Sequence, residues 1–175
     1  MGYSSIVCIG IIGKQNNLLH MSLFGEYAER TNSKVEFALI LNSSLDIFDM
    51  RQQRAPTEQD LGLLHAVDER LCVYGWLTNT GVKFAIVVDL KTPPYTGREI
   101  PTPVVGLRDS DLKPAFRALQ SSYVKLLQNP FYSPDDHSLA DINRSQAPPG
   151  GITNRQFIAE IQRIAQIWAP GVTDI

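Results

Sequence analysis

Residues 71–90 read LCVYGWLTNTGVKFAIVVDL, and this stretch decides the fold because two β-rich runs meet within it. Asn79-Thr80-Gly81 separates the runs, and Asn and Gly are the residue types that most readily supply the positive φ angles of a tight reversal. The β-branched and aromatic residues on both sides suit a pleated, packed surface. The sequence therefore predicts a β-hairpin, with Asn79 and Gly81 at positive φ.

The second run of this hairpin is apolar at every position from Phe84 to Val88. A strand with one solvated face would alternate apolar and polar residues instead. We therefore expect this strand to lie at the centre of a sheet, with both of its faces covered by other parts of the chain.

The chain before the hairpin is expected to supply three strands and one helix. Residues 5–12 and 18–24 form an opening hairpin, and residues 61–67 form the third strand. Ser33 with Glu36 fits a capping box that begins a helix over about residues 34–53. Apolar residues recur at helical spacing on its inner face, at Phe37, Leu41, Leu45 and Phe48.

The sequence after the hairpin predicts two helices, each preceded by a Pro-containing connection. Residues 91–108 and 133–151 are expected to run over the surface. A helix over 109–129 tolerates Pro114, because the N–H groups of a first turn have no partners within the helix. Thr153 with Gln156 fits a second capping box, which begins the last helix. The stripe that this helix is expected to bury is Phe157, Ile161, Ile164 and Trp168.

The resulting order is β-β-α-β-β-β-α-α, with hairpins in place of alternating β-α units, and it predicts an antiparallel sheet. We expect an α/β protein of the α+β kind, in which five strands carry one helix on one face and two on the other. At 175 residues, of which 43% are hydrophobic, the chain is expected to form a single domain over residues 1–175.

Composition excludes several classes of partner. The net charge of −2 offers no basic surplus for nucleic acid or an anionic membrane. No run approaches the roughly 20 apolar residues that span a bilayer, so direct membrane insertion is not expected. Cys8 and Cys72 both stand in strand-like apolar runs, which is typical of reduced core cysteines in the cytoplasm.

The sequence presents no catalytic constellation. His20, His65 and His137 belong to three different segments, and none has neighbours at metal-ligand spacing. The cluster 135–137, Asp-Asp-His, follows a Pro in a linker that would not hold a fixed geometry. We expect no enzymatic activity, no metal and no cofactor.

Three separated blocks carry a resemblance to a known family. The first is Tyr74-Gly75-Trp76 to Thr78-Asn79 with Val82-Lys83-Phe84 to Val87-Val88-Asp89; the second is Ser44-Leu45-Asp46; the third is Phe116-Arg117-x-Leu119 to Ser122-Tyr123, followed by Asn129-Pro130-Phe131-Tyr132. Together they resemble the sedlin family of TRAPP vesicle-tethering subunits, especially its subunit-2-like branch.

The resemblance implies a longin-like fold and a non-enzymatic adaptor subunit of the TRAPP vesicle-tethering and Rab exchange-factor complex. It implies that the chain helps to assemble or stabilise the TRAPPII-type form, in ER-Golgi and Golgi transport. The implied partners are a neighbouring core subunit and a large TRAPPII-type subunit, with an indirect link to a Rab-family GTPase. The implied location is cytoplasmic, peripheral at Golgi and ER-Golgi membranes through the complex. Compared with short family members, segments 91–108 and 133–151 look like insertions.

Two other functions stay open at this point. One is a profilin-like or PAS-like domain that encloses a small molecule between its helix and sheet. The other is the longin domain of a SNARE, which is disfavoured because the 175 residues contain no coiled-coil heptads and no membrane anchor.

The helix over 34–53 has an outer face that also carries apolar residues. Either the Pro-rich segment 91–108 folds over this face or the face binds a partner protein, with Asp46 fixing the orientation through a charge-assisted hydrogen bond. In the family that this chain resembles, the residue matching Asp46 is the acid of the Ser-Leu-Asp motif. The candidate protein-binding residues are Leu39, Ser43, Asp46, Ile47 and Met50.

Asn129-Pro130-Phe131-Tyr132 has two interpretations. It matches the short peptide pattern that phosphotyrosine-binding adaptors recognise, which requires an exposed segment. In the structural interpretation, which we favour, Asn129 ends the helix in a left-handed conformation and Phe131 and Tyr132 pack back between the helices. We group these four residues with Tyr74 and Gly75 as a structural signature.

Overall fold

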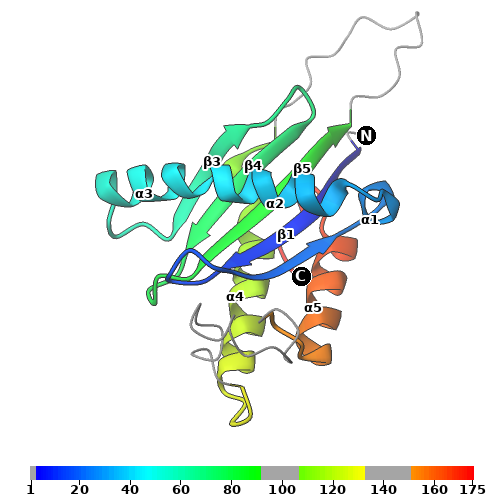
Figure 1. The fold of residues 1–175 in the computed structure, drawn as a ribbon. Coiled ribbons are helices and arrows are strands. Elements are labelled where there is room, and N and C mark those ends of the chain that lie inside the picture. The colour runs from blue at the N-terminus through cyan, green and yellow to red at the C-terminus, as the bar shows by residue number, and fades with distance from the viewer. Residues whose placement is uncertain (1–2, 92–106, 133–150) are drawn as a thin grey trace, which may run out of the picture.

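The computed structural model describes residues 3–91, 107–132 and 151–175, which form an antiparallel sheet with helices on both faces (Figure 1). The five strands lie in the order β2-β1-β5-β4-β3. The arrangement is consistent with the longin-like fold that the resemblance implies. The elements are β1 (Tyr3–Ile12), β2 (Leu18–Leu23), α1 (Glu26–Glu29), α2 (Ser33–Ser43), α3 (Leu45–Arg54), β3 (Asp60–Ala66), β4 (Leu71–Leu77), β5 (Lys83–Lys91), the 3-10 helix η1 (Asp109–Leu112), α4 (Lys113–Leu127) and α5 (Arg155–Ile167).

The hairpin that decides the fold forms as expected, but its turn uses one positive φ angle instead of two. Leu71 pairs with Asp89 at one end, and the Thr78 N–H donates to the Val82 carbonyl at the other, at 2.9 Å. Gly81 has a φ of 84°, whereas Asn79 does not have a positive φ. A three-residue loop needs only one residue in the left-handed region, after a first turn of ordinary geometry. The expectation for Asn79 was therefore wrong.

Strand β5 is central and fully covered, as predicted from its apolar run. Phe84, Ala85, Ile86, Val87 and Val88 have no solvent exposure. Successive side chains of a strand point to opposite faces, so β5 contributes to a separate core on each side of the sheet. Phe84, Ile86 and Val88 belong to the larger core, and Ala85 and Val87 belong to the smaller.

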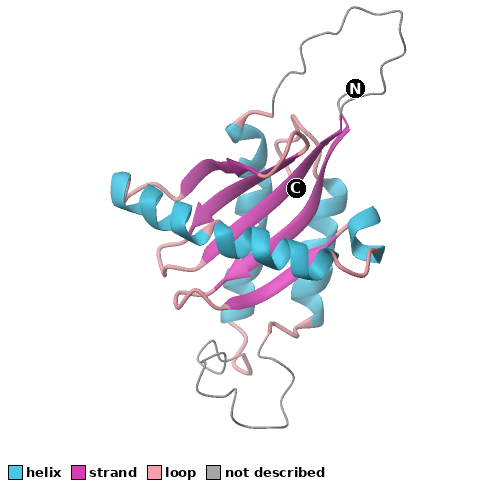
Figure 2. Ribbon diagram, turned by 45° about the horizontal axis from the view of Figure 1, so that its top comes forward, coloured by secondary structure: helices cyan, strands magenta, loops and turns pink. Residues whose placement is uncertain are grey.

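The two faces of the sheet are covered by different helices (Figure 2). The helices α2 and α3 run end to end across one face, while α4 and α5 lie side by side on the other. The predicted distribution of helices is confirmed, with two differences. The expected helix over 34–53 is divided, and the short helix α1 was not predicted, because four residues are too few to show a helical period.

Both expected capping boxes were wrong. Ser33 is buried inside the first turn of α2, after the cap residue Asn32, and its hydroxyl has no hydrogen-bond partner among the described residues. The helix α5 begins one residue later than expected, since the Asn154 side chain accepts a hydrogen bond from the Phe157 N–H at 3.1 Å. The stripe on α5 is nevertheless buried as predicted, at Phe157, Ile161, Ile164 and Trp168.

A buried ionic cluster ties α1 to the sheet. Asp89 has no solvent exposure, and its carboxylate accepts hydrogen bonds from Arg70 Nε at 3.2 Å and Nη2 at 2.7 Å. The Tyr27 hydroxyl donates to the same carboxylate at 3.3 Å. Three donors thus compensate for the removal of this charge from water. The cluster joins β5 to the connection between β3 and β4 and to α1.

None of the helices within residues 3–91, 107–132 and 151–175 has the length and apolar character that a membrane crossing requires.

Candidate functional site

The candidate surface lies on α2 and α3, which meet at Ser44. This residue is completely buried, and it closes α2 and begins α3 with helical backbone angles. The hydroxyls of Ser43 and Ser44 both donate to the Ile40 carbonyl, each at 2.8 Å. A Ser hydroxyl that bonds the carbonyl one turn earlier competes with the helical hydrogen bonds and bends helices. The Ser44-Leu45-Asp46 block therefore stands at the junction of the two helices.

The inner face of the helix pair packs into grooves made by glycines in the strands. Phe37 and Phe48 are fully buried, and Leu41 is nearly so. A Cβ atom on Gly75 would lie 2.9 Å from the Phe48 ring, and one on Gly10 would lie 2.5 Å from a Leu41 methyl group. Such distances are shorter than van der Waals contact, so only glycine admits the helices this close to the sheet. This explains Gly75 in the structural signature.

The outer face carries exposed apolar side chains, and two of the candidate protein-binding residues, Leu39 and Met50, are exposed as expected. Leu39 is 64% exposed and Met50 is 52% exposed. Val35, one turn before Leu39, is 66% exposed, and sequence reasoning missed it although its spacing of four residues was readable. Ile47 is half-buried and packs against the smaller core, so it lies at the flank of the face instead of on it. We call Val35, Leu39, Ser43, Asp46 and Met50 the outer stripe.

Asp46 stands in the first turn of α3 and is exposed. No hydrogen bond or ion pair joins its carboxylate to the residues that the structure describes. A carboxylate at this position stabilises a helix through its dipole, and this is a sufficient structural role. Since its oxygens remain available, Asp46 can also accept hydrogen bonds from a partner.

Segment 91–108, the alternative cover for the outer stripe, lies almost wholly outside the described residues. His137 and the acidic cluster at 135–137 lie outside them as well. For these segments the sequence interpretation stays a prediction.

The described histidines and cysteines have structural surroundings. His20 Nε2 lies 2.6 Å from the Ser22 hydroxyl, and burial lowers its pKa. Cys8 and Cys72 are buried free thiols whose pKa values are raised by burial, so neither is activated as a thiolate. Within the part of the chain that the structure describes, no group of three or more His, Cys, Asp or Glu side chains is placed to hold a metal ion.

Asn129-Pro130-Phe131-Tyr132 forms a tight turn. The favoured interpretation was right for Tyr132 and wrong for Asn129 and Phe131. The Tyr132 N–H donates to the Asn129 carbonyl at 3.0 Å, and the Phe131 N–H donates to Asn129 Oδ1 at 3.1 Å. The Asn side chain thus closes the turn without a left-handed backbone. Tyr132 packs against the larger core as expected, whereas Phe131 is 96% exposed.

Comparisons with known proteins agree with the blocks in the sequence. The family profile described as Sedlin matches residues 11–147. The trafficking protein particle complex subunit 2-like protein of Dictyostelium discoideum is 37% identical over 133 residues, which are 74% of this chain and 84% of that protein. The protein of the same name from Mus musculus is 33% identical over 136 residues, covering 74% of this chain and 85% of the relative. The one from Taeniopygia guttata is 33% identical over 142 residues, covering 77% and 89%.

Proposed function

This chain belongs to the Sedlin family, and we propose that it is a non-enzymatic adaptor subunit of the trafficking protein particle (TRAPP) complex. The similar proteins are named as subunits of that complex, and the similarity covers most of their length. In this role the chain contributes binding surfaces, while any exchange of guanine nucleotide on a Rab-family GTPase belongs to the assembly as a whole.

We further propose that the outer stripe is a binding surface for another subunit. Val35, Leu39 and Met50 are large apolar side chains that stay more than half exposed along one side of a helix pair. Exposed apolar groups of this size on adjoining helical turns are typical of a protein contact, because their burial provides affinity. Asp46, within the stripe, would fix the orientation through a charge-assisted hydrogen bond from the partner.

The finer proposal is that this contact helps to assemble or stabilise the TRAPPII-type form of the complex, at Golgi and ER-Golgi membranes. The partners would be a neighbouring core subunit and a large TRAPPII-type subunit. The chain itself would stay peripheral and reach the membrane through the complex. The support for this level of detail is the resemblance of the three sequence blocks to the subunit-2-like branch.

The observation that carries the proposal is the family membership, joined to an exposed apolar stripe on the helices that hold its Ser-Leu-Asp motif. Affinity purification of the tagged chain from its native cell, at low salt, tests it. We expect TRAPP subunits, including a large TRAPPII-type subunit, to co-purify, and to be absent from a parallel purification of the tag alone. Recovery of the chain without other TRAPP subunits would overturn the proposal.

A further inference from the structure

Phe131 protrudes from the turn that follows α4. Its side chain is 96% exposed, whereas every other large apolar side chain in the described ranges is at most 66% exposed. In Figure 1 this turn, drawn in yellow, lies at the far end of α4, beyond the sheet. The outer stripe lies on the opposite face of the sheet, so the two surfaces are independent. Single exposed apolar residues are common, and the significance of Phe131 therefore depends on the turn that carries it.

The turn fixes the backbone that presents the ring. The Tyr132 N–H donates to the Asn129 carbonyl at 3.0 Å, and the Phe131 N–H donates to Asn129 Oδ1 at 3.1 Å. The pyrrolidine ring of Pro130 restricts the φ angle at the second position of the turn. No peptide bond here is cis and Phe131 does not have a positive φ, which is the geometry of a type I turn. Asn129 thus closes the turn twice, through its backbone and through its side chain.

Both ends of the turn are held by the fold. On one side, the N–H groups of Gln128 and Asn129 donate to the carbonyls of Val124 and Leu126, at 3.0 and 3.1 Å. On the other side, Tyr132 packs against the larger core. A partner would therefore find the ring already in place, which lowers the entropic cost of binding. The packing of Tyr132 also disfavours recognition by a phosphotyrosine-binding adaptor, which requires the segment to be exposed.

The chemistry around the ring defines the kind of partner. Residues 126–132 carry no charged side chain. Asn129 Oδ1 is occupied, whereas its amide N–H groups form no hydrogen bond with the residues that the structure describes. The turn thus offers one apolar ring and one uncharged donor. A membrane surface is bound through a wider apolar face or several cations, whereas a protein pocket encloses a single ring.

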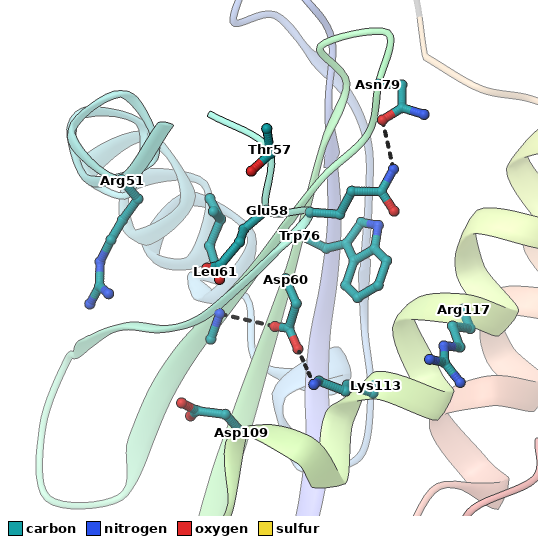
Figure 3. A pocket seen from close by; sticks show the side chains of 12 residues that line it. Arg51, Thr57, Glu58, Asp60, Leu61, Trp76, Asn79, Asp109, Lys113 and Arg117 are labelled. Carbon is teal, nitrogen blue, oxygen red and sulfur yellow. Dashed lines mark hydrogen bonds and ion pairs between the residues drawn. The ribbon is translucent and has the colours of Figure 1, made fainter. Parts of the chain in front are cut away.

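The polar cleft beside β3 is a weaker place for a partner (Figure 3). Asp60 accepts a hydrogen bond from the Gly62 N–H at 3.0 Å and pairs with Lys113 at 3.5 Å. Gln59 Nε2 donates to Asn79 Oδ1 at 2.8 Å. The charged side chains that line the cleft, three of each sign, are Arg51, Glu58, Asp60, Asp109, Lys113 and Arg117. Because these charges balance and are partly paired, the cleft favours no ligand of either sign.

We propose that Asn129-Pro130-Phe131 is a docking turn for a partner domain with a neutral, apolar pocket that encloses the Phe131 ring. An acceptor at the rim of that pocket receives the Asn129 amide N–H. The two groups reach one pocket together, because the side-chain hydrogen bond within the turn joins them directly. Burial of the ring supplies most of the affinity, as is typical of an aromatic anchor. This proposal goes beyond membership of the TRAPP complex and does not rest on it.

The test titrates a ¹⁵N-labelled EH domain, a domain type that binds Asn-Pro-Phe turns in such a pocket, with the full chain. The positive control is the peptide of residues 127–132, acetylated and amidated, and a domain that binds this peptide is used. We expect the folded chain to shift the pocket resonances in a saturable way, and to bind more tightly than the peptide because its turn is preformed. Phe131→Ala should weaken binding by at least about tenfold, and should leave thermal unfolding unchanged because the side chain is exposed.

Matched variants separate the ring and the amide from general surface effects. Leu39→Ala removes an exposed apolar side chain from the outer stripe and should leave the affinity unchanged. Asn129→Asp keeps an acceptor for the Phe131 N–H but removes the amide donor, and should weaken binding about fivefold. Gln128→Glu adds the same charge at the neighbouring exposed position and should not weaken it.

Three results would count against the proposal. A folded chain that leaves the spectrum of the EH domain unchanged, while the peptide shifts it, overturns the proposal, and so does a Phe131→Ala variant that binds like the wild type. Equal weakening by Asn129→Asp and Gln128→Glu overturns the role of the amide. Sedimentation with phosphatidylcholine vesicles that Phe131→Ala abolishes, without binding to the domain, would assign the ring to a membrane surface instead.

Discussion

Asp89 carries a charge that the fold has removed from water, and its three hydrogen-bond donors converge from α1 and from the connection before β4. In Asp89→Asn, an amide NH₂ replaces one acceptor oxygen and faces a donor. We expect the free energy of unfolding to fall by about 1–3 kcal/mol, the cost of an unsatisfied buried polar group. Urea denaturation measures the change. The exposed Asp49→Asn alters the net charge equally, and the expectation fails if both variants unfold at the same urea concentration.

His20 makes stability depend on pH in a defined direction. Burial beside the Phe157 ring lowers its pKa from the ordinary 6.5, so the unfolded chain binds a proton at higher pH than the folded chain does. The contribution of His20 is therefore complete above pH 6.5 and is lost as the pH falls through the folded pKa. We expect His20→Gln to flatten the decline in stability between neutral and mildly acidic pH, measured by urea denaturation.

The remaining pH dependence in the His20→Gln variant would come partly from His65, whose pKa burial also lowers. His65→Gln is thus the matched comparison. If stability depends on pH identically in the wild type and in His20→Gln, the assignment of this pH dependence to His20 is contradicted.

At the scale of elements, α2 and α3 pack their inner face against the sheet, and we propose that their outer stripe binds a partner. Substitutions on the outer stripe, Leu39→Asp, Asp46→Tyr or Met50→Asp, are expected to weaken co-purification with TRAPP subunits. Stability should change by no more than about 0.5 kcal/mol, because these side chains are exposed. Affinity purification of each tagged variant and thermal unfolding of each isolated variant are the measurements.

Leu41→Asp is the contrasting variant on the inner face. Leu41 is 1% exposed, so the substitution places an unpaired charge in the smaller core and should unfold the protein. The outer-stripe proposal is lost if the surface variants melt as early as Leu41→Asp. It is equally lost if they stay folded and co-purify with TRAPP subunits as the wild type does.

At the scale of the whole molecule, we expect the purified chain not to accelerate nucleotide release from any Rab-family GTPase. Within the described residues, no group of three or more His, Cys, Asp or Glu side chains is placed to hold a metal ion, and the buried thiols of Cys8 and Cys72 are not activated, so we see no constellation that would displace bound phosphate or magnesium. Release of a fluorescent guanine nucleotide from a panel of Rab proteins, with intact TRAPP complex as the positive control, measures this. Acceleration by the isolated chain would refute the expectation.

The sheet and the helix faces could be predicted because they follow from repeated patterns. The apolar run 84–88 placed β5 at the centre, and the spacing from Phe157 to Trp168 gave the buried face of α5. Features that depend on single hydrogen bonds were missed. At the division between α2 and α3, the hydroxyls of Ser43 and Ser44 both donate to the Ile40 carbonyl, and the turn at Asn129 is closed by one amide oxygen.

At the candidate surface, too, repeated spacing was predictive, whereas individual tertiary contacts were not. Helical spacing predicted that Leu39 and Met50 would be exposed, but it could not show that Ile47 leans toward the smaller core.

The interior also bears on the alternative of a ligand-sensing domain. Between β5 and the helix pair α4–α5, the rings of Phe84, Tyr123 and Phe157 meet edge to face, with centroid distances of 5.6 and 6.2 Å. Aromatic contacts of this kind fill the space that a PAS-like domain would leave for a small molecule. The packing therefore disfavours an enclosed ligand at this place.

The central position of β5 has a consequence during synthesis on the ribosome. All five strands and the helices α1 to α3 precede residue 92, whereas the larger core is completed by α4 and α5, beyond residue 112. At about 5–20 residues per second, the nascent sheet would wait several seconds with Phe84, Ile86 and Val88 facing the solvent. A newly made chain of this kind is a natural client for chaperones that shield apolar β-surfaces until the C-terminal helices emerge.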